Sequence, residues 1–192
     1  MNDLILIGGG GHCKSCIDVI EQEHKFKIIG ILDTKEKLGN QVLDYEIIGT
    51  DDDIKKYIDL GCYFLVTIGQ IKSPDLRVSI YKKLKQLNAK IAKIISPNAY
   101  VSKYAMVGSG SIIMNGTIIN AGAKIGENCI INSKALIEHD SIINNNCHIS
   151  IGAVVAGGVE IGEQSFVGAN STIAQGVKIS AKSFIKAGSL VK

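Results

Sequence analysis

Residues 8–16 read GGGGHCKSC, and three kinds of chemistry could use this stretch. If the glycines open a helix, its free backbone N–H groups could hold a phosphate, with His12 beside it. Cys13 and Cys16 have the Cys-x-x-Cys spacing of redox and zinc sites, but a structural zinc site needs four ligands and the other three cysteines stand alone. We therefore favour an anion at Gly9 to His12, against a tight turn beside a solvated histidine. The two cysteines are then small helix residues that pack against a sheet.

A dinucleotide site would require a third glycine in this stretch. The fingerprint is Gly-x-Gly-x-x-Gly, and Gly8 and Gly10 are followed by Cys13 at the third position. The stretch therefore does not predict a nicotinamide-dependent dehydrogenase.

A second group of reactive side chains lies in the other half of the chain. His139 precedes Asp140, and His148 follows nine positions later. A histidine titrates near neutrality and is the usual general base, and a carboxylate can hold its tautomer and stabilise the imidazolium. Asp140 can do so only if the turn lets adjacent side chains meet, and Glu138 is the competing partner. The alternative is a histidine that merely lies on the surface.

A six-residue repeat must position these histidines. From Ile95 to Val191, all 17 positions in steps of six are Ile or Val, and the residue two places before each of the last 16 is no larger than Val. A fixed short period indicates a solenoid, and β-branched residues favour strands whose side chains alternate between faces. The second and third places after each Ile or Val form a corner, whose second residue is Gly or Asn in 11 of 16 cases.

This pattern is typical of a left-handed parallel β-helix with three sixes per coil and a little over five coils. Because side chains alternate, each Ile or Val and the small residue before it point inward. His139 is then a first corner residue, Asp140 takes the second corner place, and His148 points outward. Both histidines are expected outside the core.

The first half of the chain reads as a small α/β unit. We expect a strand that runs into a glycine turn at 4–11, further strands at 26–33, 63–69 and 90–95, and helices at 12–23, 51–59 and 75–87. Alternation of strands and helices predicts a parallel sheet, in which ligands lie beyond the carboxyl ends of the strands. Three of those ends are GGGGH, LDT and GQ.

Composition supports two domains and small-molecule partners. Residues 1–94 carry 14 basic and 13 acidic residues and residues 95–192 carry 7 and 5, so we place a domain boundary there. A net charge of +3 without charge runs argues against a nucleic-acid or membrane surface. The apolar run in MNDLILIGGG is too short for a signal peptide, so a cytoplasmic protein with free thiols is expected.

Together these residues make the chain resemble the NeuD/PglD family of bacterial sugar acetyltransferases, over nearly its whole length. That family has a Rossmann-like domain beginning GxxGH and a hexapeptide β-helix with an N-x(5)-E-H-[ED] segment and a downstream histidine. The matching residues are Gly8 with Gly11-His12, Asp33, Ile68-Gly69, Asn132 through Glu138-His139-Asp140, and His148-x-Ser150-x-Gly152.

The resemblance implies a fold, a reaction and a site. The fold would be a Rossmann-like domain at 1–94 and a left-handed β-helix at 95–192, assembled as a homotrimer with sites between neighbouring β-helices. The reaction would transfer acetyl from acetyl-CoA, without a metal, to the amine of a nucleotide-linked amino-dideoxy sugar of the bacillosamine, legionaminic-acid or perosamine type.

Individual roles are implied in the same way. His139 would be the general base and Asp140 its acid partner, while Asn132 would orient the amine. The nucleotide-sugar would bind Gly11, His12, Asp33 and Gly69. The groove of the thioester cofactor would be formed by His148, Gly157, Ala169 and Ala187, with the Gly157 N–H facing the developing oxyanion.

Three other functions remain open from the sequence. One is O-acetylation of a sialic-acid-type sugar, and another is a non-catalytic scaffold that binds a nucleotide-sugar. The third, a γ-type carbonic anhydrase, needs three histidines for zinc, and the repeat contains only His139 and His148.

Overall fold

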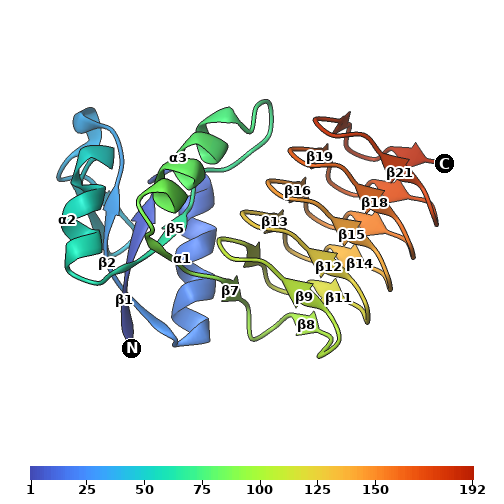
Figure 1. The fold of residues 1–192 in the computed structure, drawn as a ribbon, viewed down its shortest axis with the longest axis horizontal. Coiled ribbons are helices and arrows are strands. Elements are labelled where there is room, and N and C mark those ends of the chain that lie inside the picture. The colour runs from blue at the N-terminus through green and yellow to red at the C-terminus, as the bar shows by residue number, and fades with distance from the viewer. The chain divides into compact units, whose positions relative to one another are not determined.

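The computed structural model describes all 192 residues, which form two units, Met1–Ala92 and Lys93–Lys192 (Figure 1). The first unit alternates strands and helices. Its elements are β1 (Asn2–Ile7), α1 (Gly11–Glu23), β2 (Phe26–Leu32), η1 (Lys35–Lys37), β3 (Gln41–Val42), β4 (Tyr45–Gly49), η2 (Asp51–Asp53), α2 (Ile54–Asp59), β5 (Tyr63–Val66), α3 (Asp75–Gln86) and β6 (Lys90–Ile91).

The sheet of the first unit has the order β3-β4-β2-β1-β5-β6. All neighbouring strands are parallel except β3 and β4, which form an antiparallel hairpin at the edge. On one face of the sheet, α2 and α3 pack on β1 and β5, through residues such as Tyr57, Leu84, Ile5 and Phe64. Figure 1 shows α1 across the sheet from α2, as right-handed crossovers require.

Two features of this unit differ from the sequence-based expectations. The β3–β4 hairpin was not predicted, because β3 has two residues and β4 carries Ile47 and Ile48 side by side, without alternation. The first strand ends at Ile7 and the chain turns at Gly8, whose φ is 104°, in agreement with the expected glycine turn. The strand expected at 90–95 is two strands, β6 in the first unit and β7 in the second.

The second unit is a left-handed β-helix of two-residue strands, as the six-residue period predicts. Its first face consists of β7 (Ile94–Ile95), β10 (Ile112–Ile113), β13 (Ile130–Ile131), β16 (His148–Ile149), β19 (Phe166–Val167) and β22 (Phe184–Ile185). Its second face consists of β8 (Tyr100–Val101), β11 (Ile118–Ile119), β14 (Leu136–Ile137), β17 (Val154–Val155), β20 (Thr172–Ile173) and β23 (Leu190–Val191). Its third face consists of β9 (Met106–Val107), β12 (Lys124–Ile125), β15 (Ile142–Ile143), β18 (Glu160–Ile161) and β21 (Lys178–Ile179).

We call the edge between the first and second faces the first edge, and the edge between the second and third faces the second edge. Consecutive strands of a face lie 18 residues apart and are parallel and in register, as for Ile113 and Ile131. One coil therefore takes three sixes, as expected.

The inward positions form the core of the β-helix. The column of Ile and Val packs with the small residues, for example Ile137 with Ala135 and Ile131 with Cys129. Where the small residue is polar, its hydroxyl bonds the backbone, as Ser111 does to the carbonyl of Gly126 at 2.7 Å. The predicted inward and outward parity is confirmed.

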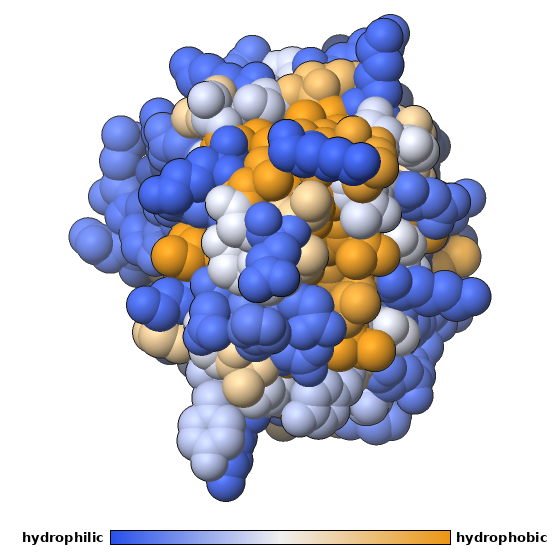
Figure 2. Space-filling view, turned by 90° about the vertical axis from the view of Figure 1, so that its right-hand side faces the viewer, coloured by the Kyte–Doolittle hydropathy of each residue, from blue (hydrophilic) through white to orange (hydrophobic).

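The last coil leaves part of this core exposed. Val177, Ile179, Ile185 and Val191 are only partly buried. Figure 2 shows hydrophobic surface in the middle of the face on this side of the molecule, surrounded by polar side chains.

Candidate active site

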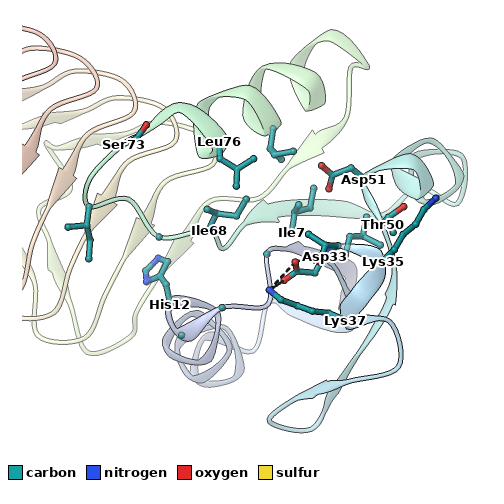
Figure 3. Close-up of a pocket in the computed structure, with 18 of the residues that line it drawn as sticks. Ile7, His12, Asp33, Lys35, Lys37, Thr50, Asp51, Ile68, Ser73 and Leu76 are labelled. Carbon is teal, nitrogen blue, oxygen red and sulfur yellow. Dashed lines mark hydrogen bonds and ion pairs between the residues drawn. The ribbon is translucent and has the colours of Figure 1, made fainter.

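A pocket of about 830 Å³ lies at the carboxyl ends of the strands in the first unit (Figure 3). Its lining includes Gly11, His12, Asp33 and Gly69, which the sequence singled out as binding residues. Gly11 and His12 begin α1, just after the loop that follows β1, and Asp33 and Gly69 lie in the loops after β2 and β5. The structure thus brings these four residues together around one cavity.

The glycine loop gives a ligand access to the backbone. A side chain at Gly8 would collide with Ile68, and its φ of 104° also requires glycine. Gly10 and Gly11, in contrast, face open space within the pocket lining. Gly10 is the N-cap of α1, so no capping side chain occupies the free N–H groups of the first turn, and no acidic residue in that turn would repel an anion. The N-terminus of α1 is therefore suited to binding an anion.

Asp33 fastens this loop from the end of β2. Its carboxylate accepts the backbone N–H groups of Gly9 and Thr34, both at 2.7 Å, and the ammonium of Lys37 at 3.0 Å. Burial opposes ionisation, but these three donors lower the pKa of Asp33 below its usual value. Asp33 is therefore ionised at neutral pH, and part of its hydrogen-bonding capacity is already used to position the loop.

Cys13 and Cys16 are both buried on α1. Burial raises the pKa of Cys13 to about 11 and raises that of Cys16 further. A thiol is a poor nucleophile and metal ligand until it ionises. These cysteines are therefore packing residues, as the sequence analysis favoured.

His139 and Asp140 form an exposed pair on the second edge of the β-helix. Asp140 has a φ of 60°, the left-handed corner conformation, and its Oδ2 lies 2.9 Å from Nδ1 of His139. The side chains are 59% and 73% exposed. Glu138 accepts only the backbone N–H of His139, at 3.2 Å, so Asp140 is the partner of the imidazole.

This contact defines the acid–base state of His139. A carboxylate can only accept, so Nδ1 carries the proton and Nε2 has the free lone pair of a base. The hydrogen bond that Nδ1–H donates to Asp140 raises the pKa of His139 above its usual value, against a smaller effect of desolvation, and the charges of Asp140 and Glu138 add to the increase.

The pH dependence of Asp140→Asn should reveal this coupling. A base must be deprotonated to act, so activity falls as the pH drops through the pKa of His139. Loss of the carboxylate lowers that pKa, and we expect the acidic limb of kcat/KM to move to lower pH. A limb that stays in place or moves upward in a steady-state pH profile would contradict the assignment.

Glycines on the neighbouring coils make room for the pair. A Cβ at Gly157 would lie 2.7 Å from Nε2 of His139, and a Cβ at Gly122 would collide with Oδ1 of Asp140. The imidazole therefore lies against the bare backbone of Gly157. The backbone N–H of Gly157 makes no hydrogen bond within the chain. A free donor therefore lies next to Nε2 of His139, the basic nitrogen of the pair.

The remaining candidates lie on or beside the first edge. Asn132 follows β13, and Ala169 and Ala187 are first corner residues after β19 and β22. His148 points outward from β16 but is only 6% exposed, and its Nε2 lies 3.2 Å from Nδ2 of Asn132. One six-residue side of the prism, up to about 20 Å long, separates this edge from the edge that bears His139. Within one chain the candidates therefore form two separate groups.

Sequence reasoning missed part of the pocket. Thr50 and Asp51 line it because they follow β4, the strand that was not predicted. Lys72, in the loop that follows β5, and Leu76, in the first turn of α3, also line it. The rule that ligands lie beyond strand ends would have found Thr50 and Asp51 once β4 was recognised.

Two further features bear on the class of protein. No helix combines the length and apolar character needed to cross a bilayer. No three His, Cys, Asp or Glu side chains are grouped so that they could hold a metal ion.

Each of the two units matches a known family model. Residues 3–84 match the PglD N-terminal domain, and residues 104–139 and 140–175 each match the bacterial transferase hexapeptide pattern of six repeats. No curated protein sequence matches the chain.

Solved structures resemble the whole chain. A histidine variant of perosamine N-acetyltransferase from Caulobacter crescentus, in complex with CoA and GDP-perosamine, is 30% identical, with a TM-score of 0.93 over 100% of this chain and 89% of that one. The acetyltransferase domain of PglB from Neisseria gonorrhoeae is 26% identical, with a TM-score of 0.92 over 100% of this chain and 92% of that one. The same domain in complex with acetyl coenzyme A has a TM-score of 0.91, at 26% identity over 100% of this chain and 93% of that one.

A Rossmann-like domain with a strand-end pocket, joined to a hexapeptide β-helix with an exposed His–Asp pair, defines a two-domain acetyltransferase. The chain belongs to the NeuD/PglD family of sugar acetyltransferases.

Proposed function

We propose that the protein transfers the acetyl group of acetyl-CoA to the amine of a nucleotide-linked amino-dideoxy sugar. The observation that carries this proposal is the exposed His139–Asp140 pair, whose basic Nε2 lies beside Gly157. The relatives that bind CoA, acetyl coenzyme A or GDP-perosamine support the choice of substrates. Because acetyl-CoA is a cytoplasmic metabolite, we place the reaction in the cytoplasm.

The chemistry follows from the two groups at the second edge. As the sugar nitrogen attacks the thioester carbon it becomes acidic, and Nε2 of His139 accepts its proton while Asp140 stabilises the imidazolium. The carbonyl oxygen gains negative charge, which the Gly157 N–H can stabilise. Collapse of the intermediate breaks the C–S bond, and the His139 imidazolium returns the proton to the sulfur, so that CoA leaves as the thiol and the sugar carries the amide. Neither role requires a metal.

The nucleotide-sugar would occupy the pocket of the first unit. Its diphosphate would lie on the N-terminus of α1 at Gly10 and Gly11, where backbone N–H groups face open space. Lys35, Lys37 and Lys72 line the same pocket and add positive charge. Asp33 and Gly69 would then contribute to binding by shaping the loops that line the pocket. His12 lies in the first turn of α1, beside Gly69.

A homotrimer would unite the two groups of site residues that one chain keeps apart. If the second faces of three prisms turn toward a threefold axis, the second edge of each prism meets the first edge of the next. His139 and Gly157 of one chain would then face Asn132, His148 and Ala169 of its neighbour. The acetyl-CoA groove would lie between the chains.

The outward side chains of the second face suit such an interface. In chain order they are Tyr100, Ile118, Leu136, Val154, Thr172 and Leu190. Only one of the six is polar, and several are well exposed, such as Tyr100 at 60% and Leu190 at 59%. The third face instead carries Lys124 and the ion pair of Glu160 with Lys178. An exposed apolar column of this length marks an interaction surface.

The substitution Ile118→Lys tests this interface. Ile118 is 41% exposed in the single chain, so a lysine there should leave the fold intact while placing charge in the interface. We expect light scattering to show dissociation of the trimer, with loss of acetyl transfer. The matched control is Met106→Lys on the third face, 64% exposed, which should remain trimeric. A trimeric, active Ile118→Lys protein would exclude the second face.

The reaction itself is tested by release of CoA thiol from acetyl-CoA with UDP- and GDP-linked amino sugars. We expect release that depends on an amine acceptor and on His139. Release with a sialic-acid-type hydroxyl acceptor, and not with amines, would instead establish O-acetylation. Binding of nucleotide-sugar without any thiol release would identify a non-catalytic scaffold.

A further inference from the structure

The amide of Asn132 is held between two groups on the first edge. Its Oδ1 lies 2.8 Å from the backbone nitrogen of Ser133, and its Nδ2 lies 3.2 Å from Nε2 of His148 on the next coil. These two contacts determine which atom faces the imidazole.

The direction of the second hydrogen bond follows from the first. A backbone N–H can only donate, so the amide atom that faces Ser133 must be the oxygen. The amide NH₂ group, which also can only donate, therefore faces His148. Nε2 of His148 must accept this hydrogen bond, and a neutral imidazole that accepts at Nε2 carries its proton on Nδ1.

The surroundings of His148 favour the same neutral form. Its neighbours on the first face are Ile130 on β13 and Phe166 on β19, neither of which can ionise. The Phe166 ring lies edge-to-face with the imidazole, 5.1 Å between centroids at 83°. The charged residue of the adjacent corner, Lys134, is exposed. A proton on Nε2 would face the donating NH₂ group of Asn132, which disfavours a buried imidazolium.

The two histidines of the β-helix thus share a tautomer but not a function. In His139 the carboxylate of Asp140 accepts a hydrogen bond from Nδ1 and leaves Nε2 as the nitrogen that can take up a proton. In His148 the amide of Asn132 bonds Nε2, the nitrogen that would otherwise accept a proton.

We propose that Asn132 is a positioning residue that keeps His148 neutral with its proton on Nδ1. His148 then acts in the cofactor groove as a hydrogen-bond donor, and His139 alone accepts protons. The role of His148 as a donor in the cofactor groove rests on the proposed acetyl transfer. The tautomer of His148 is inferred from the Asn132 contacts alone and does not depend on that function.

Nitrogen NMR of the full-length protein labelled with ¹⁵N-histidine tests the tautomer without any substrate. We expect the His148 signals to show protonated Nδ1 and unprotonated Nε2 between about pH 6 and 8, where a free histidine titrates. In Asn132→Asp the carboxylate can only accept, so Nε2 should become protonated and His148 should become an imidazolium at neutral pH. A second variant, Asn132→Ala, should allow His148 to titrate.

Asn144→Asp is the matched control. Asn144 occupies the same place in its hexapeptide, and its amide donates to the carbonyl of Ile161 at 2.9 Å, with no histidine involved. We expect this variant to leave the His148 signals unchanged. An Nε2–H tautomer or an imidazolium in the wild-type protein, or unchanged signals in Asn132→Asp, would overturn the proposal.

Kinetics separate the positioning role from a general loss of structure. For Asn132→Asp we expect kcat with acetyl-CoA to fall at least about tenfold, since a misplaced oxyanion or thioester donor costs that much or more. Asn144→Asp should retain its kcat. If neither the wild type nor any variant releases thiol, the proposed function fails while the NMR result still decides the tautomer.

Discussion

Replacement of His139 by alanine is expected to lower kcat by about 10² to 10⁴ fold, the usual contribution of a general base. The side chain is 59% exposed and its only polar side-chain contact is with Asp140, so its removal should leave the β-helix folded. Thiol release at saturating substrates measures the loss.

Two measurements make this expectation specific. Affinity for the nucleotide-sugar should be unchanged, because the pocket of the first unit contains no residue of the β-helix. Thermal unfolding should also match the wild type. Near-normal turnover in His139→Ala would remove this residue from the reaction and with it the observation that carries the proposed function.

Gly157→Ala is expected to lower kcat by roughly 10² fold, although it adds only one methyl group. The new Cβ would lie 2.7 Å from Nε2 of His139, closer than real Cβ contacts, so the exposed imidazole must move. A displacement of about 1 Å at a reacting group can cost that factor. Turnover measured beside the crystal structure of the variant should show both the loss and the shifted ring.

The neighbouring residue provides the control. Gly158 has a φ of 65° but open space around its Cβ, so Gly158→Ala strains the backbone without touching His139. We expect it to cost roughly 1 to 2 kcal/mol of stability and to leave kcat nearly unchanged. If both variants lose stability and activity together, the effect at Gly157 is structural rather than steric at the imidazole.

The β-helix could be predicted in detail because its information is local. Every sixth residue from Ile95 to Val191 is Ile or Val, and each coil needs only its neighbours to bury that column. The same parity placed His139 at a corner and outside the core. The β3–β4 hairpin could not be predicted in this way, because two or five residues without alternation carry too weak a pattern.

One signal was in the sequence at a longer period. Read in steps of 18, the outward residues from Tyr100 to Leu190 are almost entirely apolar, and this column forms the second face. Steps of six mix the three faces and hide it. The proposed interface could therefore have been recognised once the coil length was known.

By itself the sequence determined the two-domain architecture, the length of each coil and the residue types that can do chemistry. Only the tertiary structure decided where those residues meet: Asp140 rather than Glu138 on the His139 imidazole, Asn132 on His148, and His139 one prism face away from both. The physical reason is range. A strand period depends on residues a few positions apart, whereas these contacts depend on corner dihedral angles and on how successive coils stack.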